Sequence, residues 1–251
     1  MTPLITLGQF EIPVIAAGNG WLVVEKPWGM SVHNDPGADL VSFARRGPGT
    51  AGAFGIHPVH RLDRETSGVM ILCSEREVLR FFARQFDAGT VIKRYVAVLH
   101  GCMQTAPGDG EWSAWDWPLT AAAGGRRFPQ GRGELKECRT RFRVREVSRH
   151  YTMVECEPLS GRTHQIRRHA RLAGHPVVGD QRYGSTRSIA HVREQCGFTR
   201  LALHAMEIRV VPPGELRPVT FRSSAVPAEL RELFSYDSRD EIPRPFAKRP
   251  A

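Results

Sequence analysis

The chain has 251 residues, of which 41% are hydrophobic and 24% charged, which is the composition of a globular protein long enough for a full core. The formal net charge of +9 favours a polyanionic partner, most often nucleic acid. No apolar run approaches the roughly 18 residues of a membrane span, and no basic region precedes an apolar core at the N-terminus, so neither a span nor a secretory signal is predicted.

The N-terminal part predicts strands and a tight turn. Residues 4–15 alternate loosely between apolar and polar side chains, which suits an edge strand or a hairpin, and residues 21–24 form a short strand. Pro27 and Gly29 then set a turn. Lys26, in the same turn, is either a solvated lysine or a contact for a phosphate group.

A dense polar segment, residues 60–68, follows a Gly- and Pro-rich stretch in which we expect a short helix over 39–45 and then a loose loop. The polar segment runs directly into residues 69–73, which are apolar throughout and predict a buried strand. Unpaired charges beside a core are costly, so an Asp63 paired with nearby arginines would stay ionised and fixed. From the pattern alone it is equally a catalytic carboxylate or a structural residue that braces a turn.

The next segment predicts an amphipathic helix over about 75–88. Ser74 and Glu77 have the spacing of a capping box, and Gly89 stands where a helix C′ glycine belongs. Apolar residues at helical spacing form the face expected in the core: Val78, Leu79, Phe82 and Phe86.

Residues 91–101 predict a strand in which Lys93 and Tyr95 share one face. By pattern alone, Tyr95 is a half-buried core tyrosine. The Gly- and Arg-rich run over 124–133 is a flexible loop that either wraps a polyanion such as RNA or is simply solvated. Four arginines then alternate with other residues along a strand over 139–145, and this basic face either contacts phosphates or is solvated.

A further strand over 151–157 precedes a helix over 162–172. On that helix His164, Arg167, Arg168 and Arg171 lie together, which is typical of a solvated face or a phosphate-binding surface. Residues 174–180 and 200–205 are assigned to the scaffold, with His204 as a buried structural histidine. Residues 235–251 are polar and contain three prolines, so we expect a flexible tail.

Several site classes are not supported. The five cysteines are scattered, odd in number and never spaced Cys-x-x-Cys, which argues against a metal site or a disulfide framework and favours a reduced, cytoplasmic protein. The chain has no Gly-x-Gly-x-x-Gly after a strand, no P-loop, no nucleophile elbow and no His-Glu-x-x-His. We therefore expect no metal, no nucleotide cofactor and no other cofactor.

Four of these segments together resemble the signature of the RluA family of RNA pseudouridine synthases. They are His60-Arg61-Leu62-Asp63 with Thr66-Ser67-Gly68, Lys26-Pro27-Trp28-Gly29, Lys93-Arg94-Tyr95, and Gly161 to Arg167. The resemblance extends from about Gly20 to about Ile208. It implies that Asp63 is the catalytic residue, that Tyr95 lies against the target base, and that Arg167 pairs with Asp63.

The resemblance also implies an α+β fold, with a mixed, mostly antiparallel central sheet, flanking helices and loops, and an active-site cleft across the middle. We expect a catalytic domain over residues 1–234, with no room for the S4-type domain of many relatives, and a tail over 235–251. The expected partner is structured RNA, ribosomal or transfer, with no membrane contact, and the chain is expected to be a monomer. Besides the catalytic residues, eight side chains are predicted to contact RNA: His60, Arg61, Arg64, Lys93, Arg162, His164, Arg168 and Arg171.

Two other functions stay open from the sequence. One is a non-catalytic RNA-binding or chaperone protein on the same fold, against which the intact Asp63, Tyr95 and Arg167 speak. The other is a carboxylate-based hydrolase of a nucleoside or sugar. That chemistry usually needs a second acid, and the only acidic neighbour of Asp63 in the sequence is Glu65.

Overall fold

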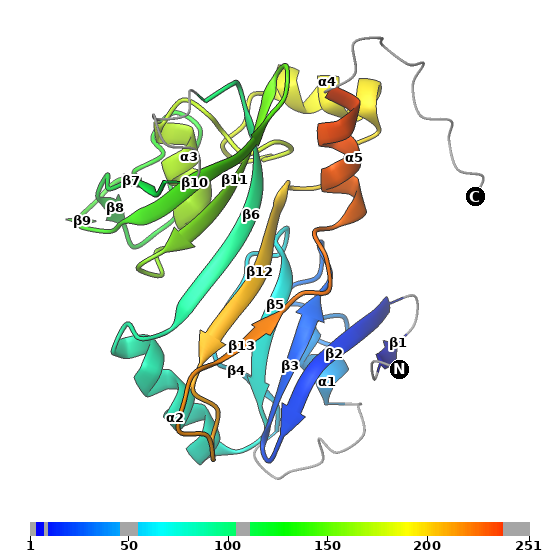
Figure 1. Cartoon of the computed structure of the whole chain (residues 1–251), viewed down its shortest axis with the longest axis vertical. Helices are drawn as coiled ribbons and strands as arrows, with labels where there is room; N and C mark the ends of the chain where they lie inside the picture. The colour runs from blue at the N-terminus through cyan, green and yellow to red at the C-terminus, as the bar shows by residue number, and fades with distance from the viewer. Residues whose placement is uncertain (1–3, 8–9, 46–54, 104–110, 238–251) are drawn as a thin grey trace. The chain divides into compact units, whose positions relative to one another are not determined.

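The computed structural model of the protein describes residues 4–7, 10–45, 55–103 and 111–237. The chain divides into two compact units (Figure 1). The first consists of Met1–Arg94 and His204–Ala225, and the second of Tyr95–Leu203 and Val226–Ala251. Each unit has its own buried core, so each is described by itself.

The strands of the first unit follow the spatial order β1-β2-β3-β5-β12, with β4 paired to β5 and β13 paired to β12. Their bounds are β1 Leu4–Leu7, β2 Phe10–Gly18, β3 Trp21–Lys26, β4 His57–Pro58, β5 Ser67–Cys73, β12 Leu203–Val210 and β13 Val219–Arg222. All these pairs are antiparallel except β5 with β12, which is parallel. The hairpin predicted for residues 4–15 and the buried strand predicted for 69–73 are both confirmed.

Helix α2 (Arg76–Asp87) covers the core of the first unit with the predicted apolar face. Phe82 is fully buried, and its ring meets Trp21 of β3 edge-on at 6.2 Å. Gly89 follows the helix with φ +67°, as a C′ glycine does. The predicted capping box is wrong, because the N-cap is Glu75 and it makes no side-chain capping bond. The short helix α1 (Leu40–Ala44) is confirmed, with Asp39 as its cap.

The second unit contains an antiparallel sheet in the order β6-β11-β10-β7. Its strands are β6 Ile92–His100, which begins in the first unit, β7 Ser113–Trp115, β10 Thr140–Val147 and β11 Tyr151–Pro158. A separate short pair joins β8 (Leu119–Thr120) to β9 (Leu135–Lys136). Every residue of β11 is buried, which is expected for a strand at the centre of a unit.

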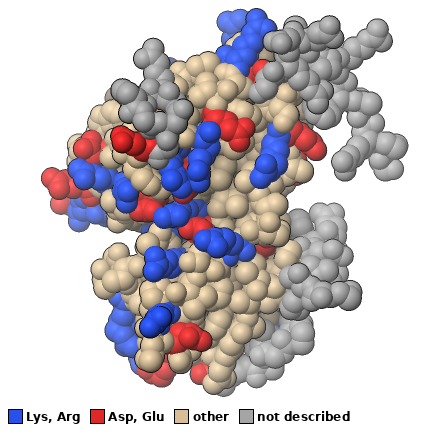
Figure 2. Space-filling model, in the orientation of Figure 1, with Lys and Arg blue, Asp and Glu red and all other residues tan. Residues whose placement is uncertain are grey.

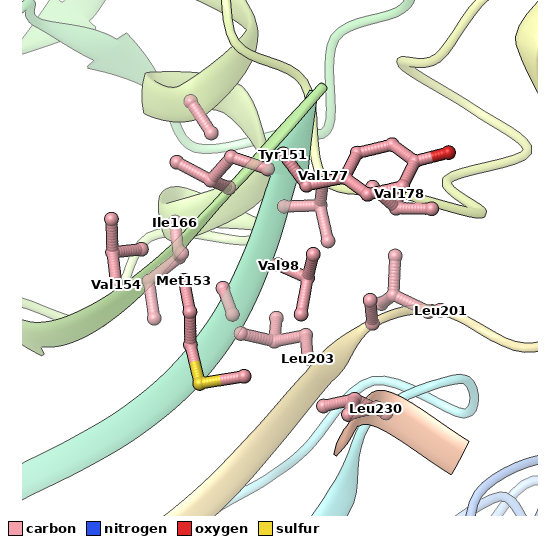
Figure 3. Packing of buried hydrophobic residues seen from close by; sticks show 14 of the residues in the cluster. Val98, Tyr151, Met153, Val154, Ile166, Val177, Val178, Leu201, Leu203 and Leu230 are labelled. Atoms are coloured by element: carbon pink, nitrogen blue, oxygen red, sulfur yellow. The ribbon is translucent and has the colours of Figure 1, made fainter. Parts of the chain in front are cut away.

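The core of the second unit joins this sheet to its helices, which are α3 (Gln165–Leu172), α4 (Thr186–Cys196) and α5 (Ala228–Asp237). Figure 3 shows Val98, Val154, Ile166 and Leu230 among the packed side chains. Ile166 and Ala170 of α3 are both buried in this core.

The C-terminal boundary differs from the predicted one. Residues 235–237, predicted as the start of a flexible tail, form the end of α5. Asp237 accepts hydrogen bonds from the Ser148 hydroxyl at 2.6 Å and from the His150 backbone N–H at 2.7 Å. Residues 238–251 lie outside the described part of the chain, as do residues 46–54, which belong to the loop predicted after the short helix, and residues 104–110.

Candidate active site

Asp63 lies in a turn that enters β5, and the backbone of this turn is tied to the turn after β3. The Thr66 N–H donates to the Asp63 carbonyl at 3.0 Å, and the Gly29 N–H donates to the Arg64 carbonyl at 2.9 Å. The Arg64 Nε returns a bond to the Gly29 carbonyl at 2.9 Å. The Asp63 side chain is half-buried. A carboxylate is therefore presented on a backbone held from both sides.

Lys26 links the same two turns through charged hydrogen bonds. Its side chain is fully buried, and the ammonium donates to three carbonyls, those of Pro27 at 2.9 Å, Met30 at 2.7 Å and Arg64 at 3.1 Å. Both alternatives predicted for Lys26, a solvated side chain and a phosphate contact, are therefore wrong. A buried ammonium group requires hydrogen-bond acceptors, and one of the acceptors here is the carbonyl of Arg64, the residue that follows Asp63. The bond therefore holds the backbone next to Asp63 in place.

The Thr66-Ser67-Gly68 run joins β5 to β12. The Ser67 hydroxyl and His204 Nδ1 lie 2.8 Å apart, and both residues are buried, which confirms His204 as a structural histidine. Gly68 has φ +118°, and a Cβ at this position would lie 2.2 Å from the Ala205 carbonyl oxygen. Only glycine fits this close backbone approach.

The predicted RNA contacts of the first unit differ in exposure. Arg61 and Arg64 are exposed, and Arg64 also lies 3.3 Å from the Asp35 carboxylate. Lys93 is half-buried, and burial lowers its pKa. These side chains remain accessible to a phosphate.

His60 has a structural environment instead. Its Nε2 accepts the Ile71 N–H at 3.2 Å, and its ring stacks on Phe86 with the centroids 5.3 Å apart. Burial, with a smaller contribution from the Lys93 charge, lowers the pKa of His60 to about 3. His60 is half-buried, and a neutral ring already engaged on the protein brings no positive charge to a phosphate. Its contact with RNA stays a prediction.

In the second unit, Tyr95 lies on β6 opposite Cys156 of β11 and packs, half-buried, against the core. Arg167 lies on α3 and is 2% exposed. Its Nε and Nη2 donate to the two carboxylate oxygens of Asp180, at 2.7 and 2.9 Å. Such a bidentate pair fixes the plane of the guanidinium.

Two further side chains extend this arrangement. The Tyr183 ring lies 5.5 Å from Arg167 Cζ, and its hydroxyl lies 3.0 Å from His164 Nδ1. His164 adopts a left-handed conformation with φ 55°, which is costly for a residue other than glycine. From the sequence, His164 was predicted inside the helix and Asp180 in the scaffold. His164 instead precedes α3 as its N-cap, and Asp180 is the buried partner of Arg167.

The prediction of an accessible basic face on α3 is wrong for Arg168. Arg168 is fully buried, and its guanidinium donates to backbone carbonyls, including those of Thr120 at 3.0 Å and Pro129 at 2.6 Å. Arg168 therefore cannot contact RNA. Arg162, His164 and Arg171 are half-buried and stay predicted contacts.

The predicted arginine face is partly solvated, since Arg139 and Arg145 are exposed, and three of its arginines pair with glutamates. Arg143 and Arg145 both bond the Glu155 carboxylate, and Arg141 bonds Glu157 at 3.2 Å. Both glutamates lie on β11, and both are nearly buried. Neighbouring carboxylates, rather than phosphates or water alone, thus relieve the repulsion between the arginines.

Charge is distributed in the same mixed manner over the visible surface. Figure 2 shows Lys and Arg side chains interspersed with Asp and Glu on the face that it presents. Within the described residues, no group of three or more His, Cys, Asp or Glu could hold a metal ion. In that same part of the chain, none of the helices combines the length and apolar character needed to span a membrane.

A cavity of about 540 Å³ lies in the second unit, between the end of β6, the β10–β11 turn, α4 and the end of α5. None of the residues predicted for catalysis or RNA contact lines it. The cavity therefore does not mark the predicted active site.

The sequence matches a known protein family. A family model described as RNA pseudouridylate synthase matches residues 20–172. The chain belongs to the RNA pseudouridylate synthase family. This confirms the family predicted from the four motifs, and the match includes Asp63, Tyr95 and Arg167.

Curated relatives support the same membership. The ribosomal large subunit pseudouridine synthase C of Pasteurella multocida is 33% identical over 214 residues, which cover 84% of this chain and 64% of the relative. The protein of the same name from Escherichia coli K12 is 36% identical over 197 residues, covering 77% of this chain and 60% of the relative. The chain thus spans less than two thirds of the length of these relatives.

Solved structures agree with the predicted α+β pseudouridine synthase fold. Human RNA pseudouridylate synthase domain containing 1 matches with a TM-score of 0.69 and 26% identity, over 85% of this chain and 83% of that one. Human RNA pseudouridylate synthase domain containing 4 shares the fold, with a TM-score of 0.68, 20% identity and coverage of 88% and 91%.

Proposed function

We propose that this chain converts selected uridines of RNA into pseudouridine and that Asp63 is its catalytic carboxylate. The observation that carries the proposal is the Asp63 turn. A carboxylate at the position of the family's catalytic residue is half-buried on a backbone tied down by Lys26 and Gly29. These ties run through Lys26, Gly29 and Arg64 and hold in place the turn that carries this carboxylate.

The reaction is an isomerisation and consumes no second substrate. The bond between uracil N1 and ribose C1′ breaks, and a bond between C5 and C1′ forms. The C5 hydrogen leaves as a proton, and N1 gains one. Asp63 either attacks the ribose at C1′ or removes a neighbouring proton, and both roles require the ionised carboxylate.

The remaining site residues bind and position the RNA in this proposal. The target base must leave its stack at a cost of a few kcal/mol, which phosphate contacts repay. Tyr95 lies against the flipped base, and Arg167 pairs with the Asp63 carboxylate while Asp180 fixes its guanidinium. The proposed RNA contacts are His60, Arg61, Arg64, Lys93, Arg162, His164 and Arg171.

The substrate proposed first is ribosomal RNA of the large subunit, because that is the RNA named for the curated relatives. Transfer RNA is the second candidate. We propose that the protein acts in the cytoplasm as a monomer and that its catalytic region lies within residues 1–237, which include all of α5.

Tritium release tests the proposal. RNA transcripts of both classes are prepared with tritium at uracil C5, and the wild type is compared with Asp63→Asn. Because formation of the C5 bond expels the C5 hydrogen, the wild type should release tritium from one class, and the variant should release none while still binding RNA. Turnover by Asp63→Asn would refute the assignment of this residue.

One control separates catalysis from folding. Asp87→Asn makes the same chemical change at an exposed position of the first unit and should leave the rate unchanged. Arg167→Ala should also lose activity, and because it leaves Asp180 buried without its partner, its thermal unfolding is measured beside its rate. Binding without release by the wild type would favour the non-catalytic RNA-binding protein, and turnover of free nucleosides would favour the hydrolase.

A further inference from the structure

The segment between β8 and β9, residues 121–134, is a folded loop rather than the flexible run that the sequence predicts. The buried side chain of Arg168 binds both sides of this loop. The guanidinium bonds Thr120 through both the carbonyl and the hydroxyl, each at 3.0 Å, and also bonds the carbonyls of Pro129 and Gln130. The guanidinium also donates to the Thr163 carbonyl at 3.2 Å, so it ties the loop to the segment before α3 and fixes the position of the loop.

Glycines allow the loop to close on itself. A Cβ on Gly124 would lie 2.3 Å from the Phe128 carbonyl oxygen, and one on Gly131 would lie 2.0 Å from the Thr120 hydroxyl. Gly125 and Phe128 exchange backbone hydrogen bonds, both at 3.1 Å. From outside, the Arg182 Nε donates to the Gly124 carbonyl at 2.7 Å. The turn over 125–128 is therefore presented at a fixed place.

The side chains at this turn are unusual for a solvated loop. Phe128 is 55% exposed, although a ring of this size is normally buried. Arg132 lies over its ring, with Cζ 4.9 Å from the centroid, and Arg127 beside it is exposed. Over residues 121–137 there are four basic and two acidic side chains, and one acid, Glu134, pairs with Lys136 at 3.7 Å. An aromatic ring and two guanidiniums thus face solvent on a rigid support.

We propose that this surface, formed by Arg127, Phe128 and Arg132, binds an unpaired segment of the RNA outside the catalytic centre. A base stacks on the Phe128 ring, and the two arginines bind the phosphates that flank it. This partner rests on the proposed function, since it assumes an RNA substrate. Base stacking fits an exposed ring because every base has a π-face, and a fixed ring loses little conformational entropy on binding.

The experiment measures RNA binding directly. A labelled RNA hairpin with an unpaired loop and a fully paired RNA duplex are titrated with the full chain. Phe128→Ala should weaken hairpin binding about tenfold, since stacking on an aromatic side chain contributes roughly 1–3 kcal/mol per base. Phe128→Leu should weaken it equally, because leucine is apolar but cannot stack, and Phe128→Tyr should restore it. Duplex binding should not depend on this residue.

Control variants remove similar groups elsewhere. Leu216→Ala truncates a 98% exposed apolar side chain of the first unit and should leave hairpin binding unchanged. Arg132→Gln should reduce the slope of log Kd against log salt by about 0.7, the value expected for one phosphate contact on a single strand. Arg217→Gln, an equal loss of charge at an exposed position, should not change the slope.

The outcomes separate this inference from the proposed function. Hairpin binding by Phe128→Ala equal to that of Leu216→Ala would refute the stacking surface, as would wild-type binding by Phe128→Leu. An equal loss with the duplex would also refute it. Phe128-dependent binding without tritium release would support this surface and refute the proposed enzyme. Tritium release together with RNA binding that does not depend on Phe128 would support the proposed enzyme and refute this surface.

Discussion

Replacing Asp180 by alanine tests the buried ion pair that holds Arg167. The Asp180 carboxylate accepts both bonds of the Arg167 fork, and one of its oxygens also accepts the backbone N–H groups of Arg182 at 2.9 Å and Tyr183 at 3.0 Å. Asp180→Ala therefore removes the carboxylate partner of a buried guanidinium and the acceptor of two N–H groups.

The expected loss is large because neither charge reaches solvent. The Arg167 and Asp180 side chains are 2% and 0% exposed. Breaking a buried pair by removing one partner costs about 3–5 kcal/mol, because the other charge stays buried without compensation. At about 2–4 °C per kcal/mol for a chain of this size, the midpoint of thermal unfolding should fall by about 6–20 °C.

Thermal unfolding of three variants supplies the comparison. Asp116→Ala breaks an exposed pair with Arg139, 3.7 Å apart with side chains 68% and 58% exposed, and should cost at most about 1 kcal/mol. The double variant Arg167→Leu with Asp180→Leu removes both charges and should recover part of the loss. A midpoint for Asp180→Ala within about 2 °C of that for Asp116→Ala would refute the reasoning.

Two more predictions follow from contacts in the first unit. Gly68→Ala should abolish soluble folded protein, because its Cβ would meet the Ala205 carbonyl at 2.2 Å. Gly29 also has a left-handed backbone, but the space around it is open, so Gly29→Ala should lower the free energy of unfolding by only about 1–2 kcal/mol. Equal stability of Gly68→Ala and Gly29→Ala in urea would contradict the steric argument. His60, with its pKa lowered to about 3 by burial and by Lys93, should show no titration by NMR between about pH 5 and 8. Between about pH 6.5, the pKa of His60 in the unfolded chain, and about pH 3, its pKa in the folded protein, only the unfolded chain binds the proton. His60 therefore makes the free energy of unfolding fall as the pH falls through this range. A midpoint near pH 6.5 in the NMR titration would contradict the lowered pKa.

Elements with a strong local pattern could be predicted from the sequence. The run over 69–73 is apolar throughout and forms β5, and the apolar stripe ending at Gly89 forms α2, because backbone geometry and burial of one face act over a few neighbouring residues. The motifs also identified the family, since their spacing along the chain needs no knowledge of packing.

Charged side chains were predicted least well. Lys26, Arg168 and the β10 arginines all suggested solvent or phosphate. The partners of Lys26 and Arg168 are backbone carbonyls far away in the sequence, and three β10 arginines pair with glutamates of the adjacent strand β11. Sequence separation hides such partners: Arg168 lies 48 residues from Thr120, and Lys26 lies 38 residues from Arg64. A pattern of basic residues cannot distinguish a buried donor from an exposed one.

The sequence by itself determined the elements with a strong local pattern, such as β5, β11 and α2, the family, and the identity of the candidate catalytic carboxylate, because these depend on local periodicity and on short motifs. Only the tertiary structure decided how that chemistry is supported. It brought Lys26 under the Asp63 turn, paired Arg167 with Asp180, and turned Arg168 inward to hold the loop that presents Phe128. The physical reason is that a buried charge must find partners wherever the folded chain provides them, whatever their distance in sequence.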